Sequence, residues 1–243
     1  MADLKGKTVV ITGGAIHLGR ATALAIAQAG ARIAFTYLNS KDDASRTLAE
    51  IKKVGQQAIA LQCDVRDGES IAGALKDIEK QFGQIDILVN NAGFYETVPF
   101  IEITEEQWDN MFAINVRGPF LVSKLCTPAL RSSQGRIINI GSLGGEKPWA
   151  THAHYCASKA ALHMLTRVMA KALAPEIAVN CVAPGMIDYA EHDSQVLKKF
   201  AGSTPMGRNG APDDVVSAVL YFAAAPHFIT GQLLTVDGGL GLK

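Results

Sequence analysis

Short apolar runs rich in β-branched residues alternate with longer segments of helical periodicity along the whole chain. The apolar runs predict strands at Thr8–Ile11, Arg32–Thr36, Ala58–Gln62, Ile85–Val89, Arg136–Ile140, Ala178–Val182 and Leu233–Val236. The segments between them predict helices at Leu18–Ala29, Lys41–Val54, Ser70–Phe82, Glu105–Ser123, His152–Leu173 and Pro212–Ala223. Because the strands are apolar almost throughout and alternate with helices, we expect a doubly wound parallel sheet of about seven strands with helices on both faces.

The length and the punctuation of the chain indicate one domain. The 243 residues fit a single α/β unit, and Gly, Pro and Ser are scattered between the periodic segments without forming a linker, a repeat or a low-complexity stretch. We therefore expect one Rossmann-like domain over residues 1–243.

Charge, hydropathy and cysteine spacing exclude several classes of function. The 23 Lys and Arg residues balance 23 Asp and Glu residues, so no strong basic field attracts nucleic acid or an anionic membrane. The apolar runs are too short to span a bilayer, and the N-terminus lacks a signal-peptide core, which predicts a cytoplasmic protein. Neither a metal site nor a disulfide framework is expected, because C-x-x-C spacing and paired His ligands are missing at Cys63, Cys126, Cys156 and Cys181.

A glycine-containing turn follows the first predicted strand. Residues 12–20 read TGGAIHLGR and open the first predicted helix. Bare backbone and the N–H groups of a helix N-terminus can bind a pyrophosphate, so this turn is a candidate dinucleotide site. A glycine in such a turn also arises for steric reasons alone, and both interpretations stay open for the turn taken by itself.

Tyr155 and Lys159 stand at i and i+4 of the longest predicted helix, and Ser142 precedes Tyr155 by thirteen residues. Residues so spaced lie about 40° apart and roughly 6 Å along the axis, so both side chains can reach one cleft. A phenol with a pKa near ~10 needs about 4 kcal/mol to work at neutral pH. An ammonium about 4 Å away supplies about 4 kcal/mol at an effective dielectric of ~20. The pair therefore suits proton transfer at a carbonyl oxygen, although the same spacing also occurs in solvated surface pairs.

The other motifs follow the predicted strands in a fixed order. They are Cys63-Asp64-Val65 after the third strand, Asn90-Asn91-Ala92-Gly93 after the fourth, Asn115 in the next helix, Pro184-Gly185 after the sixth, and Thr235-Val236-Asp237-Gly238-Gly239 near the end. Together with the Thr12-Gly13 turn, Ser142, Tyr155 and Lys159, this order resembles the short-chain dehydrogenase/reductase family over nearly the whole chain. Among its members, the overall pattern is most similar to 3-oxoacyl-carrier-protein reductases.

The resemblance implies an NAD(P)-dependent oxidoreductase that interconverts a carbonyl and a secondary alcohol by hydride transfer. It implies that Tyr155 is the general acid/base, that Lys159 holds the nicotinamide ribose, and that Ser142 hydrogen-bonds the carbonyl oxygen. Asn115 would hold its helix and a water that relays the proton. The cofactor-binding residues that it implies are Thr12, Gly13, His17, Leu18, Gly19, Tyr37, Asn39, Ser40, Cys63, Asp64 (at the adenine), Val65, Asn91 (near its ribose), Ala92, Gly93, Tyr155, Lys159, Pro184, Gly185 and Ile187.

Two residues depart from the family pattern near the cofactor. His17 stands where the family usually has a second glycine; a subset resembling pteridine reductases has a basic residue there, and His17 either touches a 2′-phosphate or lies exposed in its loop. Tyr189 stands where relatives usually have a Thr that contacts the cofactor amide, which puts that contact in doubt.

The choice of cofactor depends on the end of the second predicted strand. A carboxylate there would bind the ribose hydroxyls of NAD and repel a phosphate. Tyr37 occupies this position and is followed by Asn39, Ser40 and Lys41, of which Ser40 and Lys41 could receive a phosphate. We expect NADP(H) as the preferred cofactor, with NAD(H) possible.

Residues 184–208 predict a lid-like stretch beside the substrate. The candidate walls are mostly apolar or aromatic, which fits a small uncharged carbonyl or alcohol, although each could equally be ordinary packing: Phe94, Tyr95, Trp149, Met186, Tyr189, Phe200 and Met206. Other residues that could edge the cleft are Arg131, His152, His154 and His192.

Two other functions are compatible with these residues. One is a 3-oxoacyl-thioester reductase of fatty acid synthesis, although residues 175–177, Pro-Glu-Ile, lack the basic residue that carrier-protein reductases often have there. The other is a non-catalytic NADP-binding sensor or scaffold. Such proteins typically lose the Tyr or the Lys, and both are present here.

The helix predicted at His152–Leu173 is apolar around much of its circumference, so it needs cover on more than one side. The family resemblance implies a homotetramer, or a homodimer, in which this helix and the helix at Glu105–Ser123 pack against a partner. Burial within the monomer is the alternative.

Overall fold

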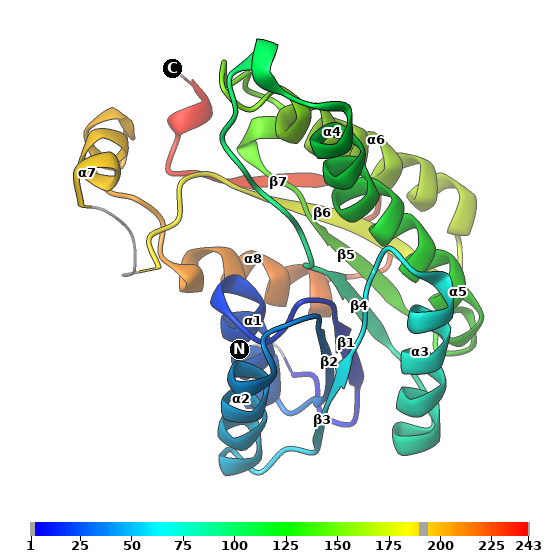
Figure 1. The fold of residues 1–243 in the computed structure, drawn as a ribbon. Coiled ribbons are helices and arrows are strands. Elements are labelled where there is room, and N and C mark those ends of the chain that lie inside the picture. The colour runs from blue at the N-terminus through cyan, green and yellow to red at the C-terminus, as the bar shows by residue number, and fades with distance from the viewer. Residues whose placement is uncertain (1–2, 190–193, 243) are drawn as a thin grey trace.

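The computed structural model, which describes residues 3–189 and 194–242, contains a parallel sheet of seven strands in the order β3-β2-β1-β4-β5-β6-β7 (Figure 1). The strands are β1 (Thr8–Ile11), β2 (Arg32–Tyr37), β3 (Ala58–Gln62), β4 (Ile87–Asn90), β5 (Arg136–Ile140), β6 (Ala178–Pro184) and β7 (Leu233–Val236). The chain moves outward from β1 to β3 and then returns to β4 on the other side of β1. This reversal of direction places the ligand crevice of such sheets beyond the carboxyl ends of β1 and β4.

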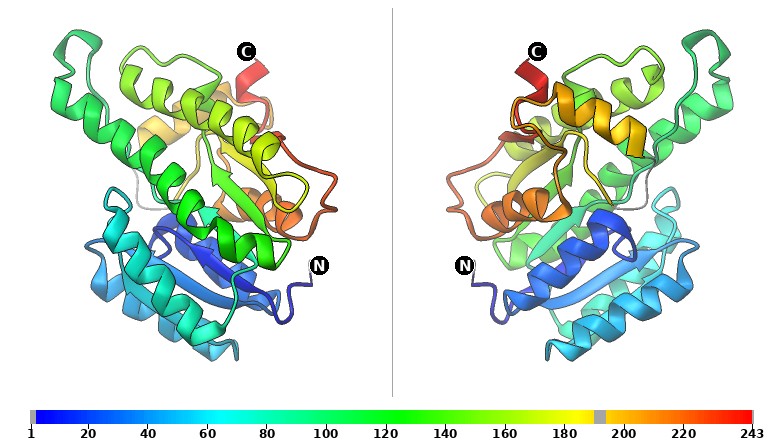
Figure 2. Two further views of the ribbon diagram at one scale, coloured as in Figure 1. Left: turned by 90° about the vertical axis from the view of Figure 1, so that its right-hand side faces the viewer. Right: turned by 90° about the vertical axis from the view of Figure 1, so that its left-hand side faces the viewer.

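Helices cover both faces of the sheet (Figure 2). One face carries α1 (His17–Gln28), α2 (Lys41–Lys53) and α8 (Pro212–Ala224), whose buried residues form one hydrophobic core with the strands. The other face carries α3 (Gly68–Phe82), α5 (Gly118–Ser132) and α6 (Ala153–Leu173), which form the second core. The predicted doubly wound Rossmann-like sheet with helices on both faces is therefore confirmed.

The predicted helix over Glu105–Ser123 was wrong at its end and in its regularity. The structure has α4 (Glu105–Phe112), a π-helical segment (Ala113–Arg117) and then α5, which continues to Ser132. Val122, Cys126 and Leu130 are buried at intervals of four residues, so packing of this stripe against the sheet carries the helix past Ser123.

The stretch after β6 also differs from the prediction. The predicted lid over residues 184–208 contains a helix, α7 (Ser194–Ser203), and β6 runs on to Pro184 rather than ending at Val182. His192 lies outside the described residues. Among the described residues, no helix is long and apolar enough to cross a membrane.

Candidate functional site

Hydrogen bonds join the turn after β1 to the end of β4. Thr12 Oγ1 accepts from the backbone N–H groups of Asn91 and Ala92, both at 3.0 Å. The side-chain amide of Asn91 donates in return to the carbonyl oxygens of Thr12 at 3.0 Å and Gly13 at 2.9 Å. The Thr12-Gly13 and Asn91-Ala92 motifs, far apart in sequence, therefore build one rigid edge of the crevice.

Three glycines shape this part of the crevice: Gly13 and Gly19 allow two backbone segments to approach closely, and Gly93 leaves space beside Lys159. Gly13 has a φ of +64°, which favours glycine, and a Cβ atom on Gly19 would lie 2.1 Å from the carbonyl oxygen of Gly13. A Cβ atom on Gly93 would lie 3.6 Å from Lys159 Nζ and 3.4 Å from Asn115 Oδ1. The first helix thus starts against bare backbone, and the floor beside Lys159 carries no side chain. This cradle fits a dinucleotide whose phosphates lie at a helix N-terminus.

Tyr155, Lys159 and Ser142 converge at the carboxyl end of β5. Tyr155 and Lys159 lie on the first turns of α6, and Ser142 follows β5 directly, where its Oγ accepts from the backbone N–H of Gly144 at 3.0 Å. Lys159 is buried, and its Nζ donates to the carbonyl oxygen of Ile140 at 2.9 Å. Residues predicted to act together from their spacing are thus brought to one place.

Burial controls the titration of this group more than the lysine does. Burial raises the pKa of Tyr155 to about 12, against the opposing effect of a side-chain hydrogen bond with Ser142. Burial also lowers the pKa of Lys159 to about 8. Lys159 Nζ lies 5.9 Å from the centroid of the Tyr155 ring and donates a hydrogen bond to the carbonyl oxygen of Ile140. The phenol is therefore held in its protonated form at neutral pH in this geometry.

Asn115 lies in the π-helical segment and is fully buried. Its side chain exchanges hydrogen bonds with the backbone of Phe94, accepting from N–H at 2.8 Å and donating to the carbonyl at 2.9 Å. The same amide donates to Ser158 Oγ at 3.1 Å, on α6 just before Lys159. Irregular helical turns of this kind occur frequently at functional sites. Asn115 thus fixes the segment after Gly93 against the helix that carries Tyr155.

Aromatic side chains surround the Tyr155 ring. Tyr95 meets it edge-on at 5.0 Å between centroids, and Trp149 lies parallel to it at 6.3 Å. His152 Nε2 hydrogen-bonds the Tyr95 hydroxyl at 2.6 Å and Thr97 Oγ1 at 2.9 Å. Burial, followed by the nearby His154, lowers the pKa of His152, so this imidazole is neutral at pH 7.

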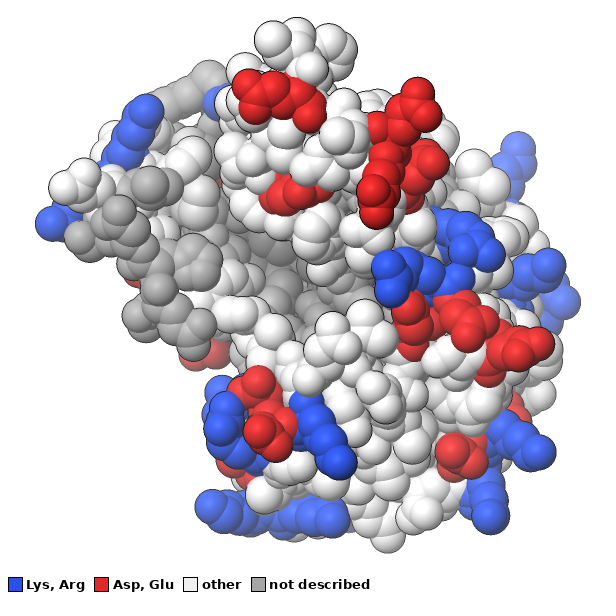
Figure 3. Space-filling model, viewed as in Figure 1, with Lys and Arg blue, Asp and Glu red and all other residues white. Residues whose placement is uncertain are grey.

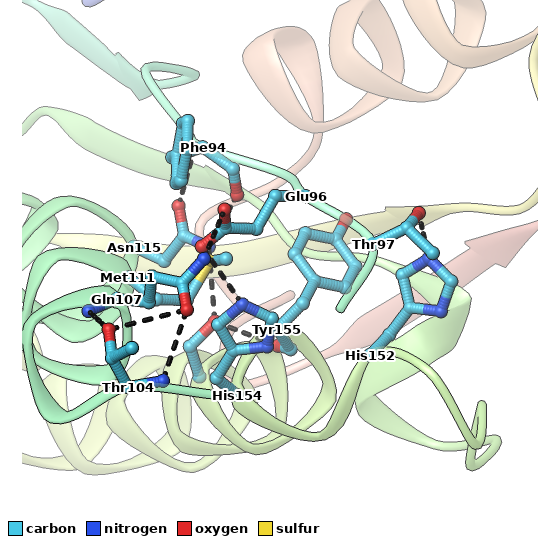
Figure 4. A network of polar contacts seen from close by, with 11 residues as sticks. Phe94, Glu96, Thr97, Thr104, Gln107, Met111, Asn115, His152, His154 and Tyr155 are labelled. Atoms are coloured by element: carbon cyan, nitrogen blue, oxygen red, sulfur yellow. Dashed lines mark hydrogen bonds and ion pairs between the residues drawn. The ribbon is translucent and has the colours of Figure 1, made fainter. Parts of the chain in front are cut away.

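Behind this aromatic group, a polar network joins three parts of the chain (Figure 4). Buried His154 on α6 contacts Glu96 through Nε2 and Oε1 at 3.1 Å, and Gln107 Nε2 donates to the other Glu96 oxygen at 3.3 Å. Gln107 in turn forms a capping box with Thr104 at the start of α4. The network was not foreseen from the sequence, because Glu96 and Gln107 acquire their meaning only once α4 and α6 lie side by side.

The remaining predicted cofactor residues line the carboxyl edge of β1 to β6. Tyr37 ends β2, Ser40 immediately precedes α2, and Asn39 between them is exposed. Asp64 accepts three side-chain hydrogen bonds and one backbone hydrogen bond from Arg66, which lower the pKa of its carboxyl group. The residues Leu18, Cys63, Val65, Pro184 and Ile187 are buried, while Ala92 and Gly185 are half-buried.

His17 and Tyr189, the two departures from the family pattern, meet across this edge. Their rings are edge-on with centroids 5.0 Å apart, and His17 adopts a φ of +48°, the left-handed region that a glycine would occupy freely. Arg131, by contrast, lies in the last turn of α5, just before β5 begins, and therefore at the amino ends of the strands, opposite the candidate site. Arg131, which the sequence allowed at the edge of the cleft, does not lie there, because a connection from a helix into a parallel strand lies at the amino end of that strand.

Comparisons with known proteins agree with this geometry. A family described as enoyl-(acyl carrier protein) reductase matches residues 14–241. A 3-oxoacyl-[acyl-carrier-protein] reductase of Staphylococcus epidermidis is 35% identical over 240 residues, covering 96% of this chain and 98% of the relative. A short-chain dehydrogenase/reductase of Serratia marcescens, solved as a mutant, superposes with a TM-score of 0.93 at 34% identity over 98% of this chain and 99% of that one. The chain belongs to the short-chain dehydrogenase/reductase family.

The same comparisons define the activity at a general level. An NAD⁺-bound xylitol dehydrogenase superposes with a TM-score of 0.91 at 30% identity, over 97% of this chain and 99% of that one. This short-chain dehydrogenase/reductase is therefore an NAD(P)-dependent oxidoreductase, as the sequence predicted. The 3-oxoacyl-[acyl-carrier-protein] reductase and the xylitol dehydrogenase are both matched over nearly their whole length.

Proposed function

We propose that this enzyme interconverts a small uncharged carbonyl compound and its secondary alcohol, with Tyr155 as the general acid/base. The nicotinamide, when bound, supplies or accepts the hydride at the carbonyl carbon. In reduction, the Tyr155 hydroxyl gives its proton to the oxygen that becomes the alcohol, and in oxidation the phenolate takes it back. The observation that carries this proposal is the convergence of Ser142, Tyr155 and Lys159 beside the open backbone at Gly93.

The supporting roles follow from the contacts of each residue. Ser142 would donate to the substrate oxygen as negative charge develops there. Lys159, buried and already bonded to Ile140, would hold the nicotinamide ribose, and Asn115 would keep the Gly93 floor and α6 in register. We also propose that the residues named from the sequence as cofactor-binding, of which Thr12 is the first and Ile187 the last, contact the dinucleotide. A single domain and a cytoplasmic location also remain predictions.

The aromatic group around Tyr155 favours a flat or cyclic carbonyl over a flexible acyl thioester. Tyr95, Trp149 and neutral His152 offer ring faces and hydrogen bonds but no positive charge to attract an acidic carrier. Figure 3 shows charged side chains of both signs around a hollow on this face. We therefore place the simple carbonyl ahead of the 3-oxoacyl thioester.

A substrate panel tests this proposal. Reduction of cyclohexanone and acetophenone should exceed reduction of an acetoacetyl thioester and of aldose sugars by at least about tenfold in kcat/KM, a factor worth about 1.4 kcal/mol of transition-state binding. Initial rates with both cofactors and purified enzyme measure it. Faster turnover of the thioester would instead assign the enzyme to fatty acid synthesis.

The proposed preference for NADP(H) rests on the start of α2. Ser40 and Lys41 lie where the helix dipole favours a phosphate, and Tyr37 leaves the end of β2 without a carboxylate. Asp42 and Asp43 in the same turn reduce the expected preference.

Replacing Tyr37 by Asp should reverse this preference by about tenfold or more in the ratio of kcat/KM for NADPH and NADH, because the new carboxylate repels the phosphate and binds the ribose. Steady-state kinetics with both cofactors measure the ratio. Gln56→Asp, in the turn between α2 and β3 at the amino ends of the strands, adds the same charge and should leave the ratio unchanged. A tenfold preference of the wild type for NADH would refute the interpretation of this loop.

A homotetramer or homodimer is proposed from the exposed apolar residues of α4, α5 and α6. On α6, Met164 and Val168 are 55% and 56% exposed, and Trp108, Phe120 and Leu125 are also exposed on the neighbouring helices. Light scattering should give the mass of two or four chains, and Met164→Glu/Val168→Glu should lower it. Val54→Glu, at an exposed apolar residue beyond α2, should not. A monomeric wild type would contradict the proposal.

A further inference from the structure

A buried histidine that the proposed chemistry does not use lies directly behind Ser142. His163, one turn after Lys159 on α6, is only 7% exposed. Its Nε2 accepts a hydrogen bond from the backbone N–H of Ser142 at 3.4 Å. The tautomer follows from this bond: Nε2 is the acceptor, so the proton of the neutral ring resides on Nδ1.

The backbone on either side of Ser142 is shaped around this ring. A Cβ atom on Gly141 would lie 2.4 Å from His163 Nε2, and a Cβ atom on Gly145 would lie 2.5 Å from His163 Cε1. No side chain can replace either hydrogen without moving the ring or the backbone. The imidazole is therefore seated in a slot made by two glycines, with Ser142 between them in sequence.

Burial keeps the His163 ring neutral, and the charges that face it act in both directions. Burial lowers the pKa of His163 to about 4; Lys159 and Arg167 act in the same direction, and Glu146 opposes them. Cys181, whose Sγ also borders Gly141, has a pKa raised by burial to about 12 and is a neutral thiol. Protonation of Nε2 would place two hydrogen-bond donors, Nε2–H and the Ser142 N–H, opposite each other. Only the neutral ring can therefore accept the hydrogen bond that fixes the turn at Ser142.

Ser142 connects this slot to the proposed acid/base. The Ser142 backbone is extended, and its N–H donates a hydrogen bond to His163 Nε2. The Ser142 hydroxyl accepts a hydrogen bond from the Gly144 N–H, and its hydrogen bond with Tyr155 lowers the pKa of the phenol. We propose that His163 is a positioning residue for Ser142, which fixes the turn from which the Ser142 hydroxyl reaches Tyr155 and the substrate oxygen. This inference rests on the proposed function of Ser142 and Tyr155.

The test uses His163→Leu, which fills the slot without an acceptor, and His163→Gln, whose Oε1 can accept from the Ser142 N–H. The variant His163→Leu should lower kcat for cyclohexanol oxidation by roughly tenfold. This is part of the loss in rate that is expected when a hydrogen-bond donor at a developing negative charge is removed. The KM for the cofactor should stay within about twofold, since the dinucleotide edge is untouched, and Gln should recover most of the rate.

The pH profile provides a readout that a purely structural role would not move. Oxidation needs the phenolate, and the hydrogen bond from Ser142 lowers the pKa of Tyr155. The rise of kcat with pH should therefore shift upward in His163→Leu and in Ser142→Ala, and return toward wild type in His163→Gln. The double variant His163→Leu/Ser142→Ala should lose no more rate than Ser142→Ala alone, because both act through one group.

Thr166→Val is the matched control. Thr166 is buried one turn further along α6 and bonds Asn139 of β5 at 2.8 Å, so its replacement removes a helix-to-strand hydrogen bond that does not reach Ser142. It should lower the melting temperature without shifting the pH profile. If His163→Leu does not fold, His163→Met serves in the same comparison.

Losses that add in the double variant, or a pH profile that is unchanged in all His163 variants, would overturn the positioning role. The outcome for the proposed function is separate. Turnover retained in Tyr155→Phe refutes the acid/base assignment, whereas an inactive Tyr155→Phe beside an unaffected His163→Leu refutes only the role of His163.

Discussion

Tyr155→Phe should lower kcat by about 10²- to 10⁴-fold in both directions, the range expected when a positioned general acid/base is removed. Only the hydroxyl is lost, so the ring still packs against Tyr95 and Trp149. Binding of the cofactor, followed by fluorescence titration, should change little because the glycine turn and the Asn91 contacts are untouched. Single-turnover and steady-state rates with cyclohexanone measure the effect.

The direction of the pH dependence follows from the raised pKa of Tyr155. Burial shifts this pKa to about 12, so the phenol is protonated through neutral pH and reduction should be nearly constant there. Oxidation needs the deprotonated form and should rise as pH increases toward the pKa in the working complex. Tyr221→Phe, an exposed tyrosine on α8, is the matched control and should leave both profiles unchanged. Retained turnover in Tyr155→Phe would assign proton transfer to another group.

The fold was predictable because its signals are local. Apolar strands such as Ile33–Phe35 and Val9–Ile11 are buried on both faces and read as continuous apolar runs, while a helix such as α3 shows one apolar stripe. The predicted boundaries failed where packing outweighed local signals. The helix does not end at Ser123 as predicted, because Cys126 and Leu130 continue the apolar stripe that packs on the sheet. Pro128 lies inside α5 without ending it.

The candidate site could be proposed from the sequence as a set of residues, but its electrostatics could not be predicted. The spacing of Tyr155 and Lys159 predicted that both side chains reach one cleft, with an ammonium about 4 Å from the phenol at an effective dielectric of ~20. The structure buries both groups and turns Lys159 to the Ile140 carbonyl, so desolvation outweighs their attraction. Burial depends on the complete packing around α6, which no local pattern reports.

Contacts between residues far apart in sequence were the other part that sequence could not supply. His163 and Ser142 are separated by 21 residues and Asn115 and Ser158 by 43, and neither pair forms a recognisable pattern. A partial signal for His163 existed in Gly141 and Gly145, because two glycines around a candidate catalytic serine indicate that something approaches the backbone closely. The identity of the approaching group required the structure.

The second large effect is expected at Gly19, where a methyl group should abolish cofactor binding or reduce the affinity by at least about 100-fold. The added Cβ would lie 2.1 Å from the Gly13 carbonyl oxygen and 2.6 Å from Asn91 Nδ2, so the turn and its bond to β4 cannot keep their geometry. The helix N-terminus would then move away from the position in which it can bind the phosphates.

The chain offers a matched control for this substitution. Gly73 lies inside α3 with open space around its Cα, so Gly73→Ala adds the same methyl group without a clash and should stabilise the fold by roughly 0.5–1 kcal/mol. Fluorescence titration with NADPH and NADH, together with thermal melting, separates the two effects. Gly19→Ala should lose binding even where it remains folded, since the clash falls on the turn itself. Tight cofactor binding by a folded Gly19→Ala would show that the dinucleotide does not lie at this turn.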